Sequence, residues 1–419
     1  MIEEKTPEEL LQERTKRVED AVQLKVPDRV PVAPNFGFFY ANYAGITPEE
    51  AHYDYDKWAT AVKKTILDFQ PDMYVSPRMI LLAPGPVLDM VDFKQIKWPG
   101  HGVSSNHSFQ FVEEEYMKAE EYDAFIEDPS DYIIRTYLPR IYGVAEPFKM
   151  LPPLSSMMVG YAAVHLTAAL ARPEVTNAIE TLSKAGAESM RWRSIMDSIH
   201  EELGGMGFPS CAQAIAEAPY DVIGDFLRGT RGVMLDMYRR PDKLIEATER
   251  VLPMQLQAAV FIAKRSGNPR VFIPLHKGAD GFMSLEQFKT FYWPTLHKLI
   301  TGLIDEGLTP WLFIEADYTS RLETIRDIPK GKAIYHFELT DIFKAKEVLG
   351  DVACIRGGVP ISLLCTGVPQ EVKDCCKKLI DVVGRGGGFI MDAGSVIDEA
   401  KPENIRVMVD FTKEYGVYG

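Results

Sequence analysis

Side chains that can bind a metal ion or move a proton directly follow two short apolar segments of this sequence. Glu315 and Asp317 come just after one segment, and His336 and Glu338 lie at the end of the next. If these segments are neighbouring parallel strands, residues beyond their carboxyl ends meet at one end of the sheet, where active sites form. Acidic residues in such places also cap helices, and a single histidine there can be a structural hydrogen-bonding residue. The pattern therefore predicts either a cluster of metal ligands or a set of loop residues.

Three more residues at the ends of apolar segments are candidate catalytic groups. His276 and Lys277 follow the segment 271–275, and Asp392 directly follows the segment 388–391. His276 or Lys277 could contact a substrate, and Asp392 could line its pocket. The alternative for the first two is an ordinary loop in which nearby glycines make turns.

An aromatic run near the amino terminus could form the wall of a pocket for a flat ring, or it could be ordinary core. We take these residues as candidate substrate contacts, with a methionine that could extend the same pocket. They are Phe36, Phe38, Phe39, Tyr40, Tyr43 and Met157.

The elements that must position these residues alternate regularly from about residue 175 onward. Apolar strand candidates, separated by amphipathic helical segments, span residues 271–275, 311–314, 333–335, 352–355 and 388–391. This alternation predicts parallel βαβ units, and 419 residues suffice for a (β/α)8 TIM barrel. We therefore expect an α/β fold with a single TIM-barrel domain over about 30–419, preceded by a helical or irregular extension over 1–30.

The amino-acid composition of the chain argues against some classes of binding partner. The net charge of −14 opposes binding to nucleic acid or anionic lipid. No segment has the length and apolarity of a secretion signal or a membrane span. The five cysteines are odd in number and form no CxxC motif, which is typical of a reducing compartment. These features predict a cytoplasmic protein that works on small molecules or other proteins.

Three segments resemble, in the right order, motifs of the uroporphyrinogen decarboxylase-like superfamily. They are Ile355–Pro360 with the following Leu363, Leu364 and Gly367, then Gly388–Ser395, and finally Lys401–Ile405. The resemblance implies a TIM barrel. The decarboxylases of the superfamily carry an arginine-rich motif after their first strand, and those arginines bind the carboxylates of the substrate. Here the matching stretch, 35–43, contains no arginine. We therefore do not expect this chain to decarboxylate porphyrinogens.

The other branch that the chain resembles consists of zinc-dependent methyltransferases that work with a corrinoid protein. The thiolate zinc ligands of one subgroup are absent, because Glu315-Ala316-Asp317 and Ser395 stand in their places. The twenty-residue spacing between Glu315 and His336 instead resembles the zinc motif of aryl-ether demethylases. That motif has a further glutamate where this chain has Ile300, so the third ligand stays open. Asp317, Glu338, Cys354 and His276 are substitutes by position.

This resemblance implies transfer of a methyl group from a methoxylated aromatic compound to the cobalt of a corrinoid, with Zn²⁺ as Lewis acid. The chain has no D-x-H-x-x-G corrinoid motif, so the corrinoid (cobalamin) would arrive on a partner protein. Alternatives that stay open are another methyl donor, such as an amine or thioether, decarboxylation of a small acid, and a non-catalytic ligand-binding role. A homodimer is implied only by analogy with the superfamily.

Overall fold

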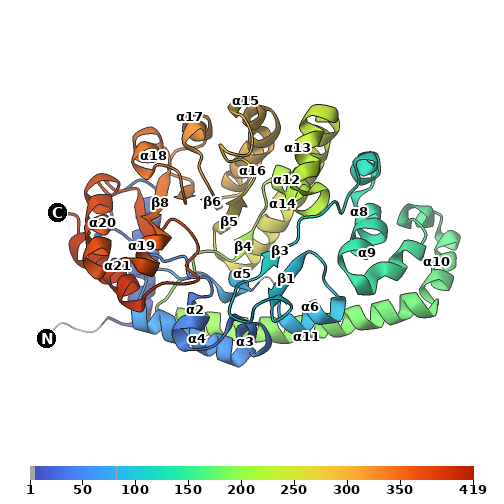
Figure 1. The fold of residues 1–419 in the computed structure, drawn as a ribbon, viewed down its shortest axis with the longest axis horizontal. Coiled ribbons are helices and arrows are strands. Elements are labelled where there is room, and N and C mark those ends of the chain that lie inside the picture. Colours follow the sequence, from blue (N-terminus) through green and yellow to red (C-terminus); the bar gives the residue numbers. More distant parts are fainter. Residues whose placement is uncertain (1–4, 82) are drawn as a thin grey trace.

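A parallel sheet of six strands forms most of a barrel in the computed structural model, which describes residues 5–81 and 83–419. Its strands are neighbours in the order in which they occur in the chain (Figure 1). They are β4 (Ala214–Ile215), β5 (Arg270–Leu275), β6 (Thr309–Ile314), β7 (Ile334–Phe337), β8 (Cys354–Val359) and β9 (Phe389–Ala393).

Two very short strands close the barrel between β9 and β4. Val32 bridges to Met391 of β9 in parallel fashion, the N–H of Asp72 donates to the carbonyl of Val32 at 2.9 Å, and Tyr74 bridges to Ser210. The first of these strands is short because the prolines that flank Val32 have no N–H to donate to a ladder. The ring of eight strands confirms the predicted (β/α)8 barrel.

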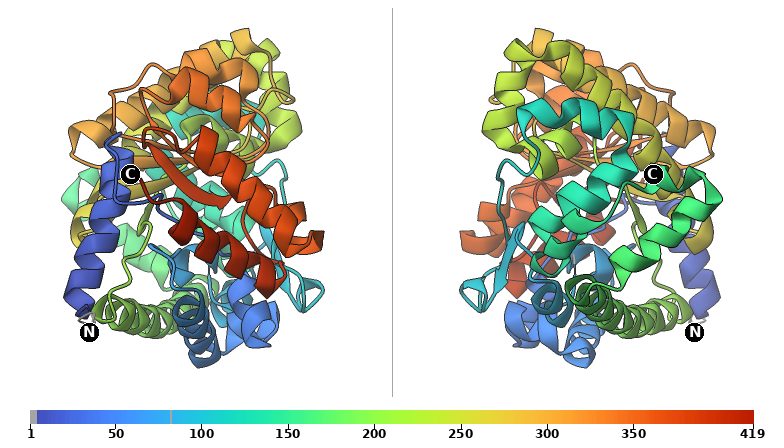
Figure 2. Two further views of the ribbon diagram at one scale, coloured as in Figure 1. Left: turned by 90° about the vertical axis from the view of Figure 1, so that its left-hand side faces the viewer. Right: turned by 90° about the vertical axis from the view of Figure 1, so that its right-hand side faces the viewer.

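Helices cover the outside of the sheet, as Figure 2 shows from two sides. The helices after β4 are α12 (Pro219–Asp221), α13 (Gly229–Arg239), α14 (Pro241–Ser266), α15 (Leu285–Gln287), α16 (Trp293–Asp305), α17 (Leu322–Ile325), α18 (Ile342–Leu349), α19 (Ile361–Thr366), α20 (Pro369–Val382) and α21 (Pro402–Tyr415). In α20 the residues Val372, Cys376 and Leu379 recur at helical spacing and are buried against the sheet.

The chain before β4 is largely helical. Its helices are α1 (Pro7–Val22), α2 (Phe39–Ala44), α3 (Pro48–Tyr53), α4 (Tyr55–Phe69), α5 (Pro77–Ile80), α6 (Gly85–Val91), α7 (Tyr122–Glu127), α8 (Pro129–Tyr132), α9 (Leu138–Ile141), α10 (Ala163–Leu170) and α11 (Pro173–Gly205). The long helix α11 runs along one side of the molecule and carries α10 at its far end (Figure 1). No helix in the described ranges is both long and apolar enough to cross a bilayer.

A small second sheet lies in the segment between α6 and α7. Its strands are β1 (Ile96–Pro99), β2 (Gly102–Val103) and β3 (Gln110–Phe111), in the order β2-β1-β3. The antiparallel pairing of β3 with β1 holds the stretch 108–111 in place. This stretch reaches the mouth of the barrel, where Ser108, Phe109 and Phe111 line the cavity described below.

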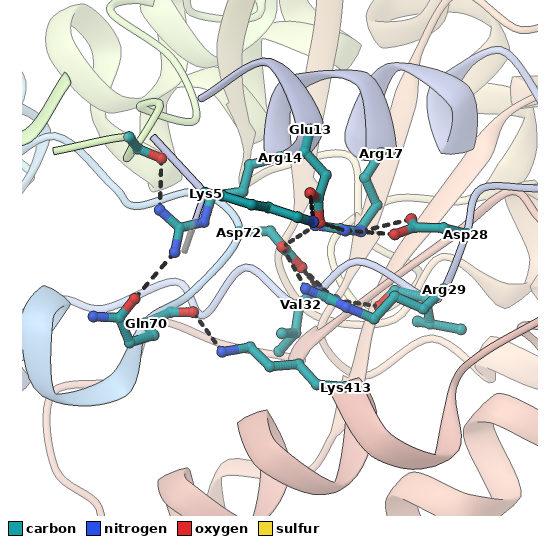
Figure 3. A network of polar contacts seen from close by, with 12 residues as sticks. Lys5, Glu13, Arg14, Arg17, Asp28, Arg29, Val32, Gln70, Asp72 and Lys413 are labelled. Atoms are coloured by element: carbon teal, nitrogen blue, oxygen red, sulfur yellow. Dashed lines mark hydrogen bonds and ion pairs between the residues drawn. The ribbon is translucent and has the colours of Figure 1, made fainter. Parts of the chain in front are cut away.

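A buried ionic network ties the amino-terminal helix to the first two strands of the barrel (Figure 3). Asp72 accepts hydrogen bonds at 2.8 Å from Arg17, from Arg29 and from the N–H of Val32. Burial alone would raise the pKa of Asp72, but the charges of Arg29 and Arg17 outweigh it and lower that pKa. The network lies at the amino-terminal end of the barrel strands, where contacts in TIM barrels serve stability rather than catalysis.

Replacing Asp72 with asparagine is expected to destabilise the fold by about 3–5 kcal/mol, because two arginines would lose their buried partner charge. Since the folded pKa of Asp72 is lowered, its contribution is present above the unfolded pKa of about 3.9 and is lost as the pH falls through the folded value. Urea unfolding at pH 7 and at acid pH measures both effects. As the control, Asp351→Asn removes an exposed pair with Arg326 and should change the urea midpoint little. Equal effects of the two variants would contradict the prediction.

Candidate active site

A cavity of about 270 Å³ opens at the carboxyl ends of the barrel strands. Strands β4, β5 and β6 form one wall, the stretch 35–38 after the first strand forms another, and the stretch 108–111 covers part of the mouth. The cavity is mostly apolar, and seven phenylalanines line it: Phe36, Phe38, Phe109, Phe111, Phe226, Phe272 and Phe313. Several of these rings are in contact, for example Phe109 with Phe111 at a centroid distance of 5.5 Å. Such a wall suits a flat apolar ring.

Three adjacent strands each place one ionisable side chain at this cavity. Glu217 follows β4, His276 follows β5 and Glu315 follows β6, and all three line the cavity. The Nε2 atom of His276 lies 3.6 Å from Oε1 of Glu315. The three side chains therefore form the polar part of the wall that follows β4, β5 and β6.

Two aspartates hold His276 in place, Asp225 through the imidazole and Asp221 through the backbone. Oδ2 of Asp225 lies 2.6 Å from Nδ1, and Asp221 accepts from the N–H groups of His276 and Lys277 at 3.0 Å. Burial lowers the pKa of His276, but the bond to Asp225 and the charge of Asp221 outweigh it and raise that pKa to about 10. Because Asp225 accepts the hydrogen bond from Nδ1–H, Nε2 is the ring nitrogen that faces Glu315 and the cavity.

Both glutamates have raised pKa values, so they keep their protons at a higher pH than exposed glutamates do. Burial raises the pKa of Glu217 to about 8, and burial also raises the pKa of Glu315 against the opposing charge of His276. The Oε2 atom of Glu217 is buried and has no hydrogen-bond partner among the described residues. A cation among these groups would supply that partner and stabilise the charged carboxylates.

Asp221, Asp225 and His276 form an acidic and imidazole group whose potential ligand atoms lie within 4.8 Å of one another. Asp221 also accepts from the hydroxyl of Tyr292 at 2.6 Å, so its oxygens already hold three donors. Asp225 is shared between His276 and Lys277, whose Nζ lies 2.6 Å from Oδ1. These two carboxylates are therefore occupied by the protein, and the donors that face the cavity are His276, Glu315 and Glu217.

The structure does not bring His336 to the mouth with Glu315. His336 lies within β7, in register with Phe313 rather than with Glu315, and is completely buried one layer deeper in the barrel. Its Nε2–H donates to the carbonyl of Ala393 at 2.8 Å, and its ring packs on Phe313. The predicted grouping of these two residues is therefore corrected, because β7 continues past His336 before it reaches the mouth.

The other two predicted ligands also have local roles. Asp317 is exposed and accepts from the N–H of Thr319 at 2.8 Å. Glu338 accepts from the N–H of Ala316 at 2.8 Å, which holds the loop after β6. Neither residue lines the cavity, so they act as the loop residues that formed the alternative interpretation.

Of the predicted catalytic residues, His276 lines the cavity and the other two do not. Lys277 is buried and pairs with Asp225 and Glu113, the latter at 3.1 Å. Asp392 is buried inside the barrel, where Arg356 donates to it at 2.9 Å. Both residues support neighbouring structure rather than face the cavity.

Of the aromatic residues predicted to contact a substrate, some line the cavity and others do not. Phe36 and Phe38 line the cavity, whereas Phe39 and Tyr40 are buried core and Tyr43 packs on Phe69. A helical turn, α2, starts within the run and directs successive rings to different sides. Met157 lies in η4 (Leu154–Met158), outside the cavity, so its predicted contact with a substrate is corrected.

The sequence patterns did not single out Glu217, Asp221 or Asp225. The strand before Glu217 pairs over only two residues, so it leaves no apolar run in the sequence. Asp225 lies in η6 (Val222–Arg228), a π-helical stretch, and such stretches often occur at functional sites. The one available signal was the group of three acidic residues in Glu217–Asp225, just upstream of a helix.

Comparisons with known proteins agree with the barrel. A family model described as uroporphyrinogen decarboxylase (URO-D) matches residues 171–415, more than half of the chain. Two curated relatives, uroporphyrinogen decarboxylases of Chlorobium phaeovibrioides and Chlorobium luteolum, are each 30% identical over 78 residues, which is 18% of this chain and 22% of theirs. The match therefore spans about a fifth of those relatives. A methyltransferase from Methanosarcina mazei has a similar fold, with a TM-score of 0.62 at 15% identity over 96% of this chain and 98% of its own. By the extent of the family match and the barrel that it describes, this chain belongs to the uroporphyrinogen decarboxylase family.

Proposed function

We propose that this protein is a methyltransferase that takes a methyl group from a methoxylated aromatic compound and passes it to the cobalt of a corrinoid carried by a partner protein. A zinc ion would be held by His276, Glu315 and Glu217. The observation that carries the proposal is that these three donors follow adjacent strands and line one wall of a phenylalanine-lined cavity. The fold similarity to the Methanosarcina mazei methyltransferase supports the reaction class.

The donor atoms of these three residues are of the types that zinc prefers. Nitrogen and carboxylate oxygen are ordinary zinc ligands, and catalytic sites use three protein ligands. Asp225 behind the imidazole is the carboxylate partner that zinc-binding histidines usually have. No described residue is a partner for the buried Oε2 of Glu217, which leaves this oxygen free to bind an ion. When bound, the ion would act as a Lewis acid that withdraws electron density from the ether oxygen.

The residues of the chain have separate parts in this function. The phenylalanines enclose the ring of the substrate and exclude water from the reacting bond. Asp225 fixes the orientation of His276, and Asp221 fixes the backbone that carries it. Glu217 and Glu315 would hold the cation as carboxylates, since its charge would oppose the effect of burial that raises their pKa values.

Porphyrinogen decarboxylation is disfavoured by the same cavity. None of the described residues that line it is lysine or arginine, and its charged groups are Glu217, Glu315, Asp398 and the imidazole of His276. A substrate with many carboxylates needs cationic partners when it leaves water. The absence of arginine in the stretch 35–43 leads to the same conclusion from the sequence.

Cobalt spectroscopy tests the proposal directly. The purified protein, loaded with zinc, is mixed with a corrinoid protein reduced to Co(I) and with single methoxylated phenols. We expect the Co(I) absorption to disappear only when both the protein and a methoxylated phenol are present, with release of the demethylated phenol. Methylamines and methyl thioethers are tested in parallel, and turnover of only those donors would replace the proposed substrate class. Release of CO₂ from a small acid without any corrinoid would overturn the proposed reaction.

A further inference from the structure

The side-chain amide of Asn35 is a buried polar group at the cavity wall that the protein leaves without a partner. Asn35 is 4% exposed, it lines the cavity, and its Nδ2 has no hydrogen-bond partner among the described residues. Its backbone is held firmly, because its N–H donates to Asp392 at 2.8 Å and its carbonyl accepts from Ile397 at 2.9 Å. Buried amides in native proteins are normally paired, so this amide indicates a ligand that pairs with it.

Asn35 lies across the cavity from the proposed metal ligands. It follows the first strand of the ring, whereas Glu315 follows β6, which is the fifth. In a closed ring of eight strands the first and the fifth are opposite each other. A ring-shaped ligand whose oxygen faces Glu315 and His276 therefore presents its far edge to Asn35.

The charges around the cavity limit what that far edge can carry. Among the described lining residues there is no lysine or arginine, and Asp398 lies on the same side as Asn35. Lys277, behind the opposite wall, is already paired with Asp225 and Glu113. A carboxylate on the ligand would thus be buried without a cation, which is costly. An uncharged oxygen can accept from the Asn35 amide without that cost.

We propose that the substrate is an uncharged aryl methyl ether whose far edge, para to the methoxy group, carries a neutral oxygen that accepts a hydrogen bond from Asn35. The position of the methoxy group rests on the proposed function, whereas recognition by Asn35 rests on the cavity itself. Asn35 is then a specificity-determining residue, and the phenylalanines are unselective walls for the ring.

Calorimetric binding to the zinc-loaded protein, without any corrinoid, tests this recognition. The probes are anisole, 4-methoxyphenol and 4-methoxybenzoate. We expect 4-methoxyphenol to bind about five- to tenfold more tightly than anisole, the worth of one hydrogen bond, and 4-methoxybenzoate to bind more weakly than both. Asn35→Ala should abolish the advantage of 4-methoxyphenol and leave the affinity for anisole unchanged. Asn177→Ala, at an exposed position on α11, is the matched control and should change neither affinity.

Unchanged anisole binding shows that the Asn35 variant is folded with an intact cavity. Equal or tighter binding of 4-methoxybenzoate, an equal loss of both neutral probes in Asn35→Ala, or no binding of any probe would overturn the inference. Tighter binding of phenyltrimethylammonium than of 4-methoxyphenol would do so as well, since the cavity would then select a cation. If 4-methoxyphenol binds as expected but its methyl group is never transferred, the proposed function fails while the recognition by Asn35 stands.

Discussion

Replacing His276 with alanine is expected to remove bound zinc and to reduce methyl transfer by a factor of about 10³ or more, because one of three protein ligands is lost. His276 is the one histidine that lines the cavity among the described residues, and Asp225 holds its imidazole in the orientation that exposes Nε2. Zinc is measured by metal analysis of protein purified in zinc-containing buffer, and activity is measured by loss of the Co(I) absorption. Circular dichroism confirms that the variant is folded.

Two control variants make this result specific. His297→Ala changes a partly exposed histidine on α16 and should retain both zinc and activity. His336→Asn changes the buried histidine of β7 and should lower the urea midpoint while the zinc content stays near one per chain. Loss of zinc in His336→Asn together with its retention in His276→Ala would restore the ligand set that the sequence spacing favoured and would refute the one proposed here.

The late strands of the barrel could be predicted from the sequence because their physical pattern is strong. Strands β5 to β9 are almost wholly buried, and each contains a short run of apolar residues between amphipathic helices. The first two strands leave no such apolar segment in the sequence. They contribute only isolated bridges at Val32 and Tyr74, and the first is interrupted by prolines. Their place in the ring is set by contacts with β9 and β4, which lie far away in the sequence.

Part of the candidate site was predicted from the sequence. The errors in that prediction concern where the strands end and how they pair. Glu315 and His276 were identified because each comes directly after a strand, and both line the cavity. His336 was misplaced because the end of β7 was set two residues too early, and in a barrel two residues separate one layer of side chains from the next. Glu217 follows a strand of two paired residues, so no local pattern marked it. Three-dimensional register, rather than residue type, decides which of these side chains meet.

Replacing Asp225 with asparagine is expected to lower zinc affinity or activity by about 10- to 100-fold while the variant keeps its fold, since Asp225 contacts the imidazole and not the substrate. An asparagine of the same size can still accept from Nδ1–H, but it has no charge to balance the imidazole or the ammonium group of Lys277. Zinc affinity is measured by competition with a chelator of known strength, and activity is measured at saturating zinc. A loss that appears only in the chelator competition indicates weaker metal binding. A loss of activity that persists at saturating zinc indicates a misoriented ligand.

The variant Asp221→Asn is the control for Asp225→Asn. Asp221 is completely buried and holds two backbone N–H groups and the Tyr292 hydroxyl, so Asp221→Asn should act mainly on stability, with a lower urea midpoint. If Asp225→Asn lowered the urea midpoint as much as Asp221→Asn and left zinc affinity unchanged, Asp225 would be a structural residue. The imidazole of His276 would then need no carboxylate behind it to bind the ion, and the proposed metal site would have to rest on the three cavity-facing donors alone.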